Sequence, residues 1–150
     1  IKLWGERAKP VLLAMVQSKE DVVRVAGIAG LRQLGAIDEH LVPRLHAILT
    51  GRAPAGDDVR AAAAVALAHA SKTAIQPAIS ALTHVLGPRQ DPQASEPRST
   101  NGTLSKPDAV ILATARSLLA IGGKSYRTLI AERADRSPEP LRAQLRGLLA

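Results

Sequence analysis

Apolar residues recur at intervals of three and four along most of the chain, which is the spacing of amphipathic helices and not of strands. This spacing predicts helices over residues 8–17, 21–35 and 39–50. The stripe expected to face the core comprises Val22, Val25, Ile28, Ala29, Leu31 and Leu34 in the second helix, and Leu41, Leu45, Ile48 and Leu49 in the third. We expect Gly35 to end the second helix as a left-handed C-cap and Asp38 to cap the third.

The same helix–turn–helix pattern then recurs. The segment DVVRVAGIAGL, which begins at Asp21, aligns with DDVRAAAAVAL, which begins at Asp57 and opens a helix expected to end near Ala70, at a shift of 36 residues. The second helices of the units align through Pro10, Pro43 and Pro77. The apolar stripes of the later helices comprise Ile75, Ile79, Leu82 and Leu86, followed in a third copy by Leu118, Leu119 and Ile121. The third copy ends in the helix SYRTLIAERA, and Pro140-Leu141-Arg142 begins a fourth.

Self-similar units of this length predict an all-α fold, an α-solenoid whose neighbouring helix pairs stack on one shared core. We expect a single domain over residues 1–150, with about three helix pairs at 19–50, 57–86 and 106–133 and half-repeats at 1–18 and 137–150. Residues 87–105 interrupt the pattern, either as a mobile insertion or as a docking or modification site at Ser95, Ser99 or Thr100. Because the chain does not begin with Met, we expect an excised fragment or a processed form, although Ala150 could be a natural C-terminus.

The motif that carries these repeats has a known counterpart. Asp57-Asp58-Val59-Arg60, the alanines that lead to Leu67, and a second helix with proline and leucines resemble the HEAT repeat. More narrowly, they resemble short bacterial HEAT-like repeats that also occur in phycobilisome lyases. Residues 106–133 match weakly, with Ile111 where the arginine would stand. The resemblance implies an armadillo-like helical scaffold that binds other proteins, and it brings no catalytic or cofactor-binding residue to this chain.

Composition strengthens the helical interpretation. Hydrophobic residues make up 46% of the chain, but the aromatic residues are only Trp4 and Tyr126, so alanine and leucine must fill the core. The shortage of aromatics argues against pockets that stack or flip nucleic-acid bases. The absence of cysteine excludes disulfides and thiolate zinc sites but does not decide between cytoplasm and periplasm. No apolar run is long enough to predict a membrane span.

Charged residues suggest structure more than catalysis. The acids gather at expected helix starts, where they would act as caps: Asp21, Asp38, Glu39, Asp57, Asp58, Asp108 and Glu139. Asp57 and Asp58 could instead be a general acid/base pair, and the Asp21/Asp57 and Arg24/Arg60 positions could form ion pairs from repeat to repeat. The four histidines, His40, His46, His69 and His84, lack the spacing of a helical metal site. We therefore expect no catalytic residues, no metal and no cofactor.

The net charge of +7 points to an acidic partner. Positive residues are frequent after residue 109: Arg116, Lys124, Arg127, Arg133, Arg136, Arg142 and Arg146. If the second helices line the concave side of a solenoid, the exposed positions there are Lys9, His40, Arg44, Gln76, His84, Tyr126, Arg127 and Arg133. These eight are our candidate partner-binding residues, because tyrosine and arginine are common at interface hot spots. A merely solvated basic face is the alternative.

The leading hypothesis is a non-catalytic protein-interaction scaffold whose basic concave face recognises an acidic protein segment or a neighbouring domain. The second is sequence-nonspecific nucleic-acid binding through phosphate contacts, which the charge favours and the scarcity of stacking residues does not. The third is an enzyme that resembles bilin lyases or HEAT-like DNA glycosylases. For these the chain offers the repeat but no aromatic-lined pocket, since Trp4 stands alone near the terminus.

Overall fold

The computed structural model describes residues 2–50, 52, 55–86, 106–137 and 139–149, and all regular structure within these ranges is helical. The helices are α1 (Lys2–Val16), α2 (Asp21–Gln33), α3 (Val42–Leu49), α4 (Asp57–Leu67), α5 (Ile75–Leu86), α6 (Lys106–Gly122), the 3-10 turn η1 (Gly123–Tyr126), α7 (Arg127–Asp135) and α8 (Leu141–Leu148). The expected all-α class is confirmed. The segment 87–105, with its candidate sites, lies outside the described residues.

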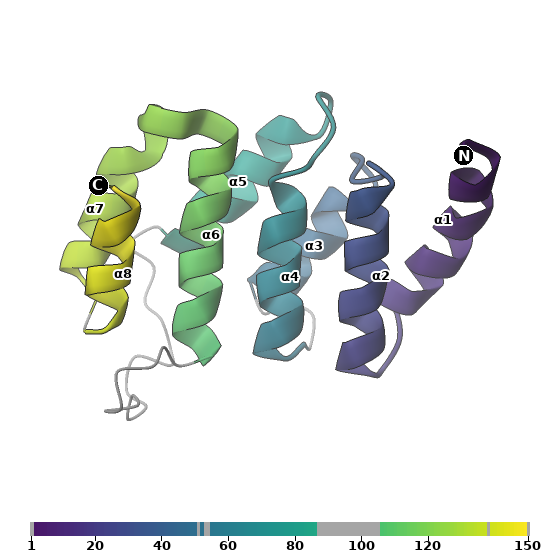
Figure 1. Ribbon diagram of the computed structural model, residues 1–150, viewed down its shortest axis with the longest axis horizontal. Helices are drawn as coiled ribbons and strands as arrows, with labels where there is room; N and C mark the ends of the chain where they lie inside the picture. The colour runs from purple at the N-terminus through teal and green to yellow at the C-terminus, as the bar shows by residue number, and fades with distance from the viewer. Residues whose placement is uncertain (1, 51, 53–54, 87–105, 138, 150) are drawn as a thin grey trace.

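The helices form two layers (Figure 1). The first layer contains α2, α4, α6 and α8, each in contact with the next. The second layer lies behind it and contains α1, α3, α5 and α7, of which α3 contacts α5 and α5 contacts α7. Each helix of the second layer packs most extensively on the first-layer helix that follows it in the chain. Most helices that are adjacent in sequence, such as α1 and α2, α4 and α5, and α7 and α8, therefore also pack together.

Leucine and alanine fill the space between the layers. Large side chains from successive helices are fully buried there, among them Leu31, Leu45, Leu67, Leu82, Leu118 and Leu145. Alanines with no exposed surface lie between them, including Ala63, Ala64 and Ala66 on α4 and Ala78 and Ala81 on α5. Small side chains let helices approach one another closely, so the alanine excess in the composition has a packing role.

The expected apolar stripes are confirmed in α3 and only in part in α2. Leu41, Leu45, Ile48 and Leu49 are all buried. In α2, Ile28 and Leu31 are buried, but Val22 is 82% exposed and Leu34 is 42% exposed, so their assignment to the core was wrong. Three-residue steps on a helix fall about 60° short of a full turn. The ends of a stripe spaced by threes therefore rotate away from the core that its centre faces.

The turn between α2 and α3 has the capping chemistry that its sequence predicts. Gly35 has φ +67°, its N–H donates to the Arg32 carbonyl, and the N–H of Ala36 donates to the Leu31 carbonyl, as in a Schellman motif. Asp38 Oδ1 then accepts the N–H groups of His40 at 3.1 Å and Leu41 at 3.0 Å. Residues 39–41 form a turn from which two amides donate to the Asp38 cap, and α3 begins after this turn, at Val42 and not at residue 39.

Other helix limits also differ from the expected ones. Helix α1 begins well before residue 8, at Lys2, and α4 ends at Leu67, where a turn replaces the expected continuation to Ala70. The helix expected over SYRTLIAERA is divided between η1 and α7. Helices α6 and α8 lie where the sequence pattern predicts helices in the third and fourth units.

An arginine near the start of three first-layer helices binds a backbone carbonyl that precedes the helix. Arg24 Nε donates to the Ser18 carbonyl, just after α1, and Arg60 Nε donates to the Leu49 carbonyl at 3.2 Å, at the end of α3. Arg142 Nε donates to the Ser137 carbonyl at 3.0 Å, after α7. Carbonyls at a helix end lack partners within the helix, and a cation there also complements the helix dipole.

This contact replaces the ion-pair ladder expected between repeats. The ion pairs of the repeat motif join residues of one helix, Asp21 with Arg24 at 3.8 Å and Asp57 with Arg60 at 3.3 Å. Connection from helix to helix therefore runs from arginine to carbonyl. The expectation failed because each aspartate is only three residues from its own arginine and lies on the same helical face.

Helix α6 lacks the motif arginine, and an arginine from another element makes the corresponding contact with the carbonyl at the end of the preceding helix. Ile111 stands at that position and is buried. The Leu86 carbonyl, at the end of α5, instead accepts from Nη2 of Arg136 at 3.3 Å. Arg136 follows α7 directly, fifty residues further along the chain. The structure thus compensates for the divergent third repeat with a residue that no local alignment identifies.

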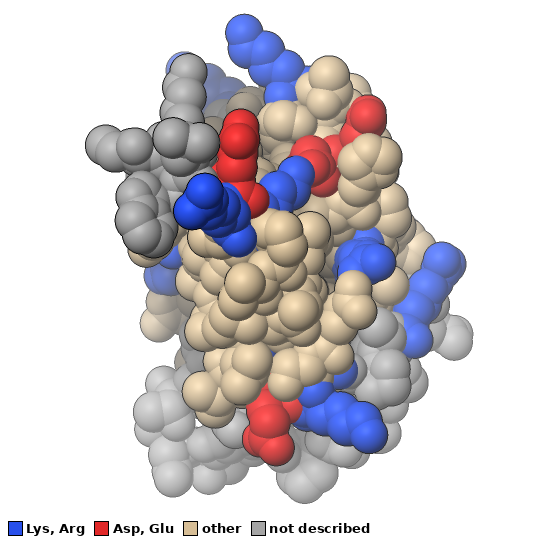
Figure 2. Space-filling model, turned by 90° about the vertical axis from the view of Figure 1, so that its right-hand side faces the viewer, with Lys and Arg blue, Asp and Glu red and all other residues tan. Residues whose placement is uncertain are grey.

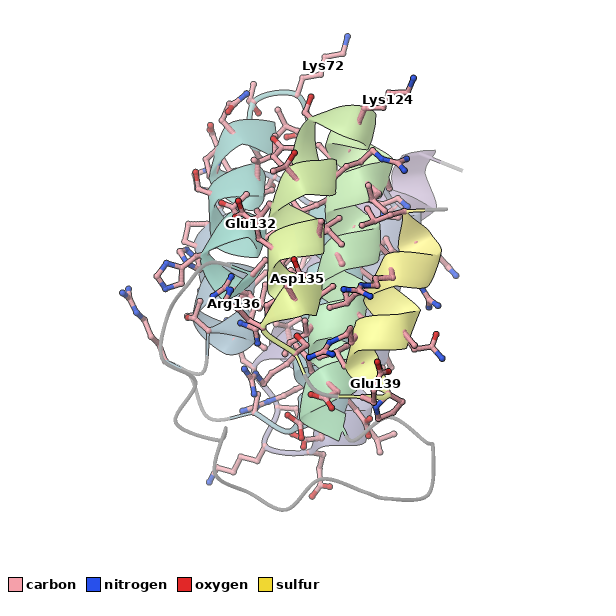
Figure 3. The ribbon with its side chains drawn as sticks, turned by 90° about the vertical axis from the view of Figure 1, so that its left-hand side faces the viewer. Lys72, Lys124, Glu132, Asp135, Arg136 and Glu139 are labelled. Atoms are coloured by element: carbon pink, nitrogen blue, oxygen red, sulfur yellow. The ribbon has the colours of Figure 1, made fainter. Side chains whose placement is uncertain are left out.

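The two ends of the array differ in surface chemistry. Figure 2 shows the α1 end, where uncharged residues form the middle of the face and charged residues lie towards its edges. Val11, on α1, is 61% exposed. The opposite end carries charges of both signs on α7 and beside it, including Glu132, Asp135, Arg136 and Glu139 (Figure 3).

Candidate protein-binding surface

The eight candidate residues belong to the second layer or to the turns that lead into it. Lys9 is on α1, His40 precedes α3, and Arg44 is on α3; Gln76 and His84 are on α5, Tyr126 is in η1, and Arg127 and Arg133 are on α7. Five of them are exposed, namely His40, Arg44, Gln76, His84 and Arg127. Because they extend from the first helix to the seventh, they do not form one compact site.

Lys9 is half-buried and serves to hold the α2–α3 turn. Its Nζ donates to Asp38 Oδ2 at 2.9 Å. The hydrogen bond from Lys9 is the main cause that lowers the pKa of Asp38; burial opposes it, and the amides of Leu41 and His40 reinforce it. The Lys9 charge is therefore compensated within the molecule, and Lys9 contributes little to a basic surface.

The three candidates at the C-terminal end are also engaged in structure. Tyr126 is half-buried and its ring lies so close over Gly122 that a Cβ there would collide with it. Arg127 Nη2 donates to the Leu149 carbonyl, after α8. Arg133 is half-buried, and its Nε atom is buried completely. Tyr126 and Arg133 were expected to be exposed, but η1 turns the chain back on α6 and brings this segment against the core.

The other arginines of this end also have partners. Arg136 and Arg142 bind carbonyls, and Arg146 Nη2 lies 2.9 Å from Asp135 Oδ1. The excess of positive residues after residue 109 therefore does not produce a uniformly basic surface, because several of these arginines are bound to carboxylates or to carbonyls at helix ends.

A more consistently basic region lies over α3 and α5. The sequence has no Asp or Glu in residues 40–56 or 59–86. Between these ranges, Asp57 is paired with Arg60 and belongs to the first layer. We call the second-layer surface of these two helices the α3–α5 face; it comprises the exposed residues His40, Arg44, Arg52, Gln76 and His84 and the half-buried His46. Lys72, in the turn before α5, points away from the helices (Figure 3).

Two histidines meet on this face. The ring centroids of His46 and His84 are 6.0 Å apart, and the rings are inclined at 70°, edge to face. Burial is the main cause that lowers the pKa of His46, and the positive charges of His84 and Arg52 lower it further. His46 is therefore neutral at neutral pH.

Histidine spacing within one helix does not reveal this pair, because its two members lie on different helices. A signal was present in the proline alignment. His46 stands three residues after Pro43, and His84 stands seven residues after Pro77. Positions three and seven lie on the same side of a helix, one turn apart, so two side-by-side helices would bring them close together.

Within the described ranges, no cluster of three or more His, Cys, Asp or Glu side chains is arranged to hold a metal ion. None of the described helices combines the length and the apolar character needed to cross a membrane. Comparison with known proteins found no matching family model, no matching curated protein and no matching solved structure.

Proposed function

We propose that this chain is a non-catalytic protein-interaction scaffold, an α-solenoid of HEAT-like helix pairs whose α3–α5 face binds an acidic segment of a partner protein or neighbouring domain. The observation that carries the proposal is the combination of exposed basic residues with the absence of acids on α3 and α5. A basic surface without neighbouring carboxylates attracts and orients an acidic ligand.

Two features support the solenoid. Each first-layer helix contacts the next, and each second-layer helix packs on the first-layer helix that follows it, so the array can present a long surface. The arginine-to-carbonyl contacts of Arg24, Arg60 and Arg142 also recur from one helix pair to the next. Such repetition is what stacked, equivalent units would produce.

The geometry narrows the set of binding residues. His40, Arg44, Gln76 and His84 remain, and His46 and Arg52 join them. Lys9, Tyr126, Arg127 and Arg133 are assigned to structural contacts instead. The retained residues belong to two adjacent helices and the turns beside them, as a single peptide segment would require.

Charge reversal on this face tests the proposal. The double variant Arg44→Glu/Arg52→Glu should weaken binding of a fluorescent oligo-aspartate peptide about tenfold, a change of about 1.4 kcal/mol, measured by anisotropy at about 50 mM salt. The control Arg116→Glu/Lys124→Glu makes the same change in net charge at exposed positions on α6 and η1. Helical circular dichroism should be unchanged in both.

The possible outcomes separate the hypotheses. Failure of the unmodified protein to bind the peptide, or equal weakening in both double variants, would remove the proposed face. Tighter binding to duplex DNA than to the peptide, with a steep dependence on salt, would favour nucleic-acid binding, for which the net charge of +7 is the supporting observation.

A further inference from the structure

We propose that His46, His84 and Arg52 form a carboxylate-binding site on the α3–α5 face, and that an acidic peptide binds there with uptake of a proton. This inference rests on the proposed function and specifies the chemistry of the same face. Its ligand is an aspartate or glutamate side chain of the partner. The proton comes from solvent and goes to an imidazole of the pair.

The geometry suits a small anion with two oxygens. His46 and His84 come from the last turns of α3 and α5, which lie side by side. Their ring centroids are 6.0 Å apart at 70°, so the rings are adjacent but not stacked. A charge-assisted N–H···O bond is about 2.8 Å long. A carboxylate that accepts one such bond from each ring spans a separation of this size, with the Arg52 guanidinium as a third source of positive charge.

Among the described residues, the acids next to α3 along the chain lie at or before the starts of helices. On α4, Asp57 is paired with Arg60, which also donates to the Leu49 carbonyl, and Asp58 is exposed at the start of the helix. Asp38 binds Lys9 before α3 begins, at the end of that helix away from His46.

Among the described residues, the elements packed against α5 that carry charges include α6 and α7. Glu132 and Asp135, on α7, are exposed, and Arg133 is half-buried. Asp108, in the first turn of α6, is buried. Arg136 donates to the Leu86 carbonyl, two residues after His84. In the free protein, the groups that act electrostatically on His46 are the basic residues His84 and Arg52.

These neighbours make the affinity of the site for a carboxylate depend on pH. In the free protein, burial and the two positive neighbours hold the pKa of His46 below its ordinary 6.5. A bound carboxylate reverses the charge balance and raises that pKa. The binding free energy gained from the imidazolium is then fully present below the pKa of the free protein, and it is lost as pH rises through the pKa of the complex.

The test measures binding of labelled oligo-aspartate to the full chain across the range from about pH 5.5 to 7.5, in which histidine changes charge. The unmodified protein should bind about tenfold more tightly at the acid end. His46→Gln/His84→Gln should bind with nearly the same affinity at both ends. The control His69→Gln alters an exposed histidine in the turn after α4 and should keep the full pH dependence.

A second measurement does not depend on the folding of any variant. Adding peptide to the unmodified protein should raise the pKa of His46, followed by NMR through its imidazole protons. Peptide binding that is independent of pH, or an unmoved His46 titration, would overturn the carboxylate site and leave the scaffold proposal intact. No peptide binding at any pH would overturn both.

Discussion

Gly35 ends α2 through a backbone conformation that other residues adopt with difficulty. Its φ is +67°, and a Cβ added there would have no neighbour within 4 Å. Replacement by alanine therefore introduces no clash, and its cost comes from the left-handed conformation alone. We expect Gly35→Ala to lower the free energy of unfolding by about 1 kcal/mol.

Urea denaturation would measure the loss. Gly35→Asn is the matched control, because asparagine enters the left-handed region more readily than alanine does. It should lose less stability than Gly35→Ala. Equal losses in the two variants would mean that something other than backbone conformation sets the cost.

Asp38 makes a contribution to stability that depends on pH. Its pKa in the folded protein is held below the ordinary 3.8, chiefly by the hydrogen bond from Lys9. Because the folded pKa is the lower one, this stabilisation is present above pH 3.8 and disappears as pH falls through the folded value. Asp38→Asn should therefore be less stable than the unmodified protein at pH 7, and the difference should vanish in strong acid.

The size of this effect is limited by exposure. The side chains of Lys9 and Asp38 remain 42% and 31% exposed, so we expect a loss at pH 7 of only a few tenths to about 1 kcal/mol. Lys9→Met should show a similar loss at neutral pH in urea titrations, whereas Lys124→Met, at an exposed position in η1, should not. A loss for Asp38→Asn that persists unchanged below pH 3 would assign the effect to the cap and not to the charge.

At the scale of elements, the repeated arginines connect one layer to the other. Arg60 bonds both to Asp57 in its own helix and to the Leu49 carbonyl at the end of α3. Removing a charged, partly buried donor also leaves that carbonyl without this partner. We expect Arg60→Met to cost about 1–2 kcal/mol in the free energy of unfolding, because methionine keeps much of the packing but donates no hydrogen bond.

The control for this variant is Arg116→Met on α6. Arg116 is an exposed first-layer arginine outside the repeat motif. Its replacement should change stability by less than about 0.5 kcal/mol. Thermal or urea unfolding of both variants would check the prediction, which a comparable loss in the two would contradict.

The limits of prediction from sequence follow from these contacts. Periodicity identifies the helices and the core stripe of α3, because side chains three and four apart lie on one face of a helix. The motif alignment also finds Arg24 and Arg60 as equivalent positions. It cannot find Arg136, because the carbonyl that Arg136 binds lies fifty residues earlier on another element.

Contacts between elements also limit how well the exposure of the candidate surface residues can be predicted from sequence. The eight residues were assigned to second helices; the structure has six of them on second-layer helices, with His40 in the turn before α3 and Tyr126 in η1. Whether a cationic side chain faces solvent depends on the acceptors that other elements place beside it. Asp38 is the acceptor for Lys9. The carbonyls of Leu49 and Leu149, at or just after helix ends, are the acceptors for Arg60 and Arg127. Predicting the contact between His46 and His84 likewise requires the register of α3 against α5, which the sequence does not give directly.

At the scale of the whole molecule, the contacts are between neighbours in the array. Helix α1 packs mainly on α2, whereas α4 contacts α2, α3, α5 and α6. The middle of the α1 end is uncharged (Figure 2). Val11, on α1, is 61% exposed. If the chain is the α-solenoid we propose, its stability is a sum of local and nearest-neighbour terms, so an end helix can detach while the rest stays folded.

Gly27 allows this expectation to be tested. A Cβ at Gly27 would lie 2.8 Å from Met15 Cβ, 2.9 Å from the Leu12 carbonyl oxygen and 3.0 Å from the Val16 nitrogen. Two of these atoms are backbone, so α1 itself must move to make room. We expect Gly27→Val to displace α1 and to leave the contacts among α4, α6 and α8 in place.

Hydrogen exchange followed by mass spectrometry would resolve the two regions. Peptides from α1 should lose most of their protection in Gly27→Val, while peptides from α6 should exchange as in the unmodified protein. Gly147→Ala is the control at the other end, since a Cβ there meets nothing within 4 Å and alanine favours helix by up to about 1 kcal/mol. It should preserve protection everywhere. Equal loss of protection in α1 and α6 of Gly27→Val would mean that the array unfolds as one unit, and the nearest-neighbour description would then be wrong for this molecule.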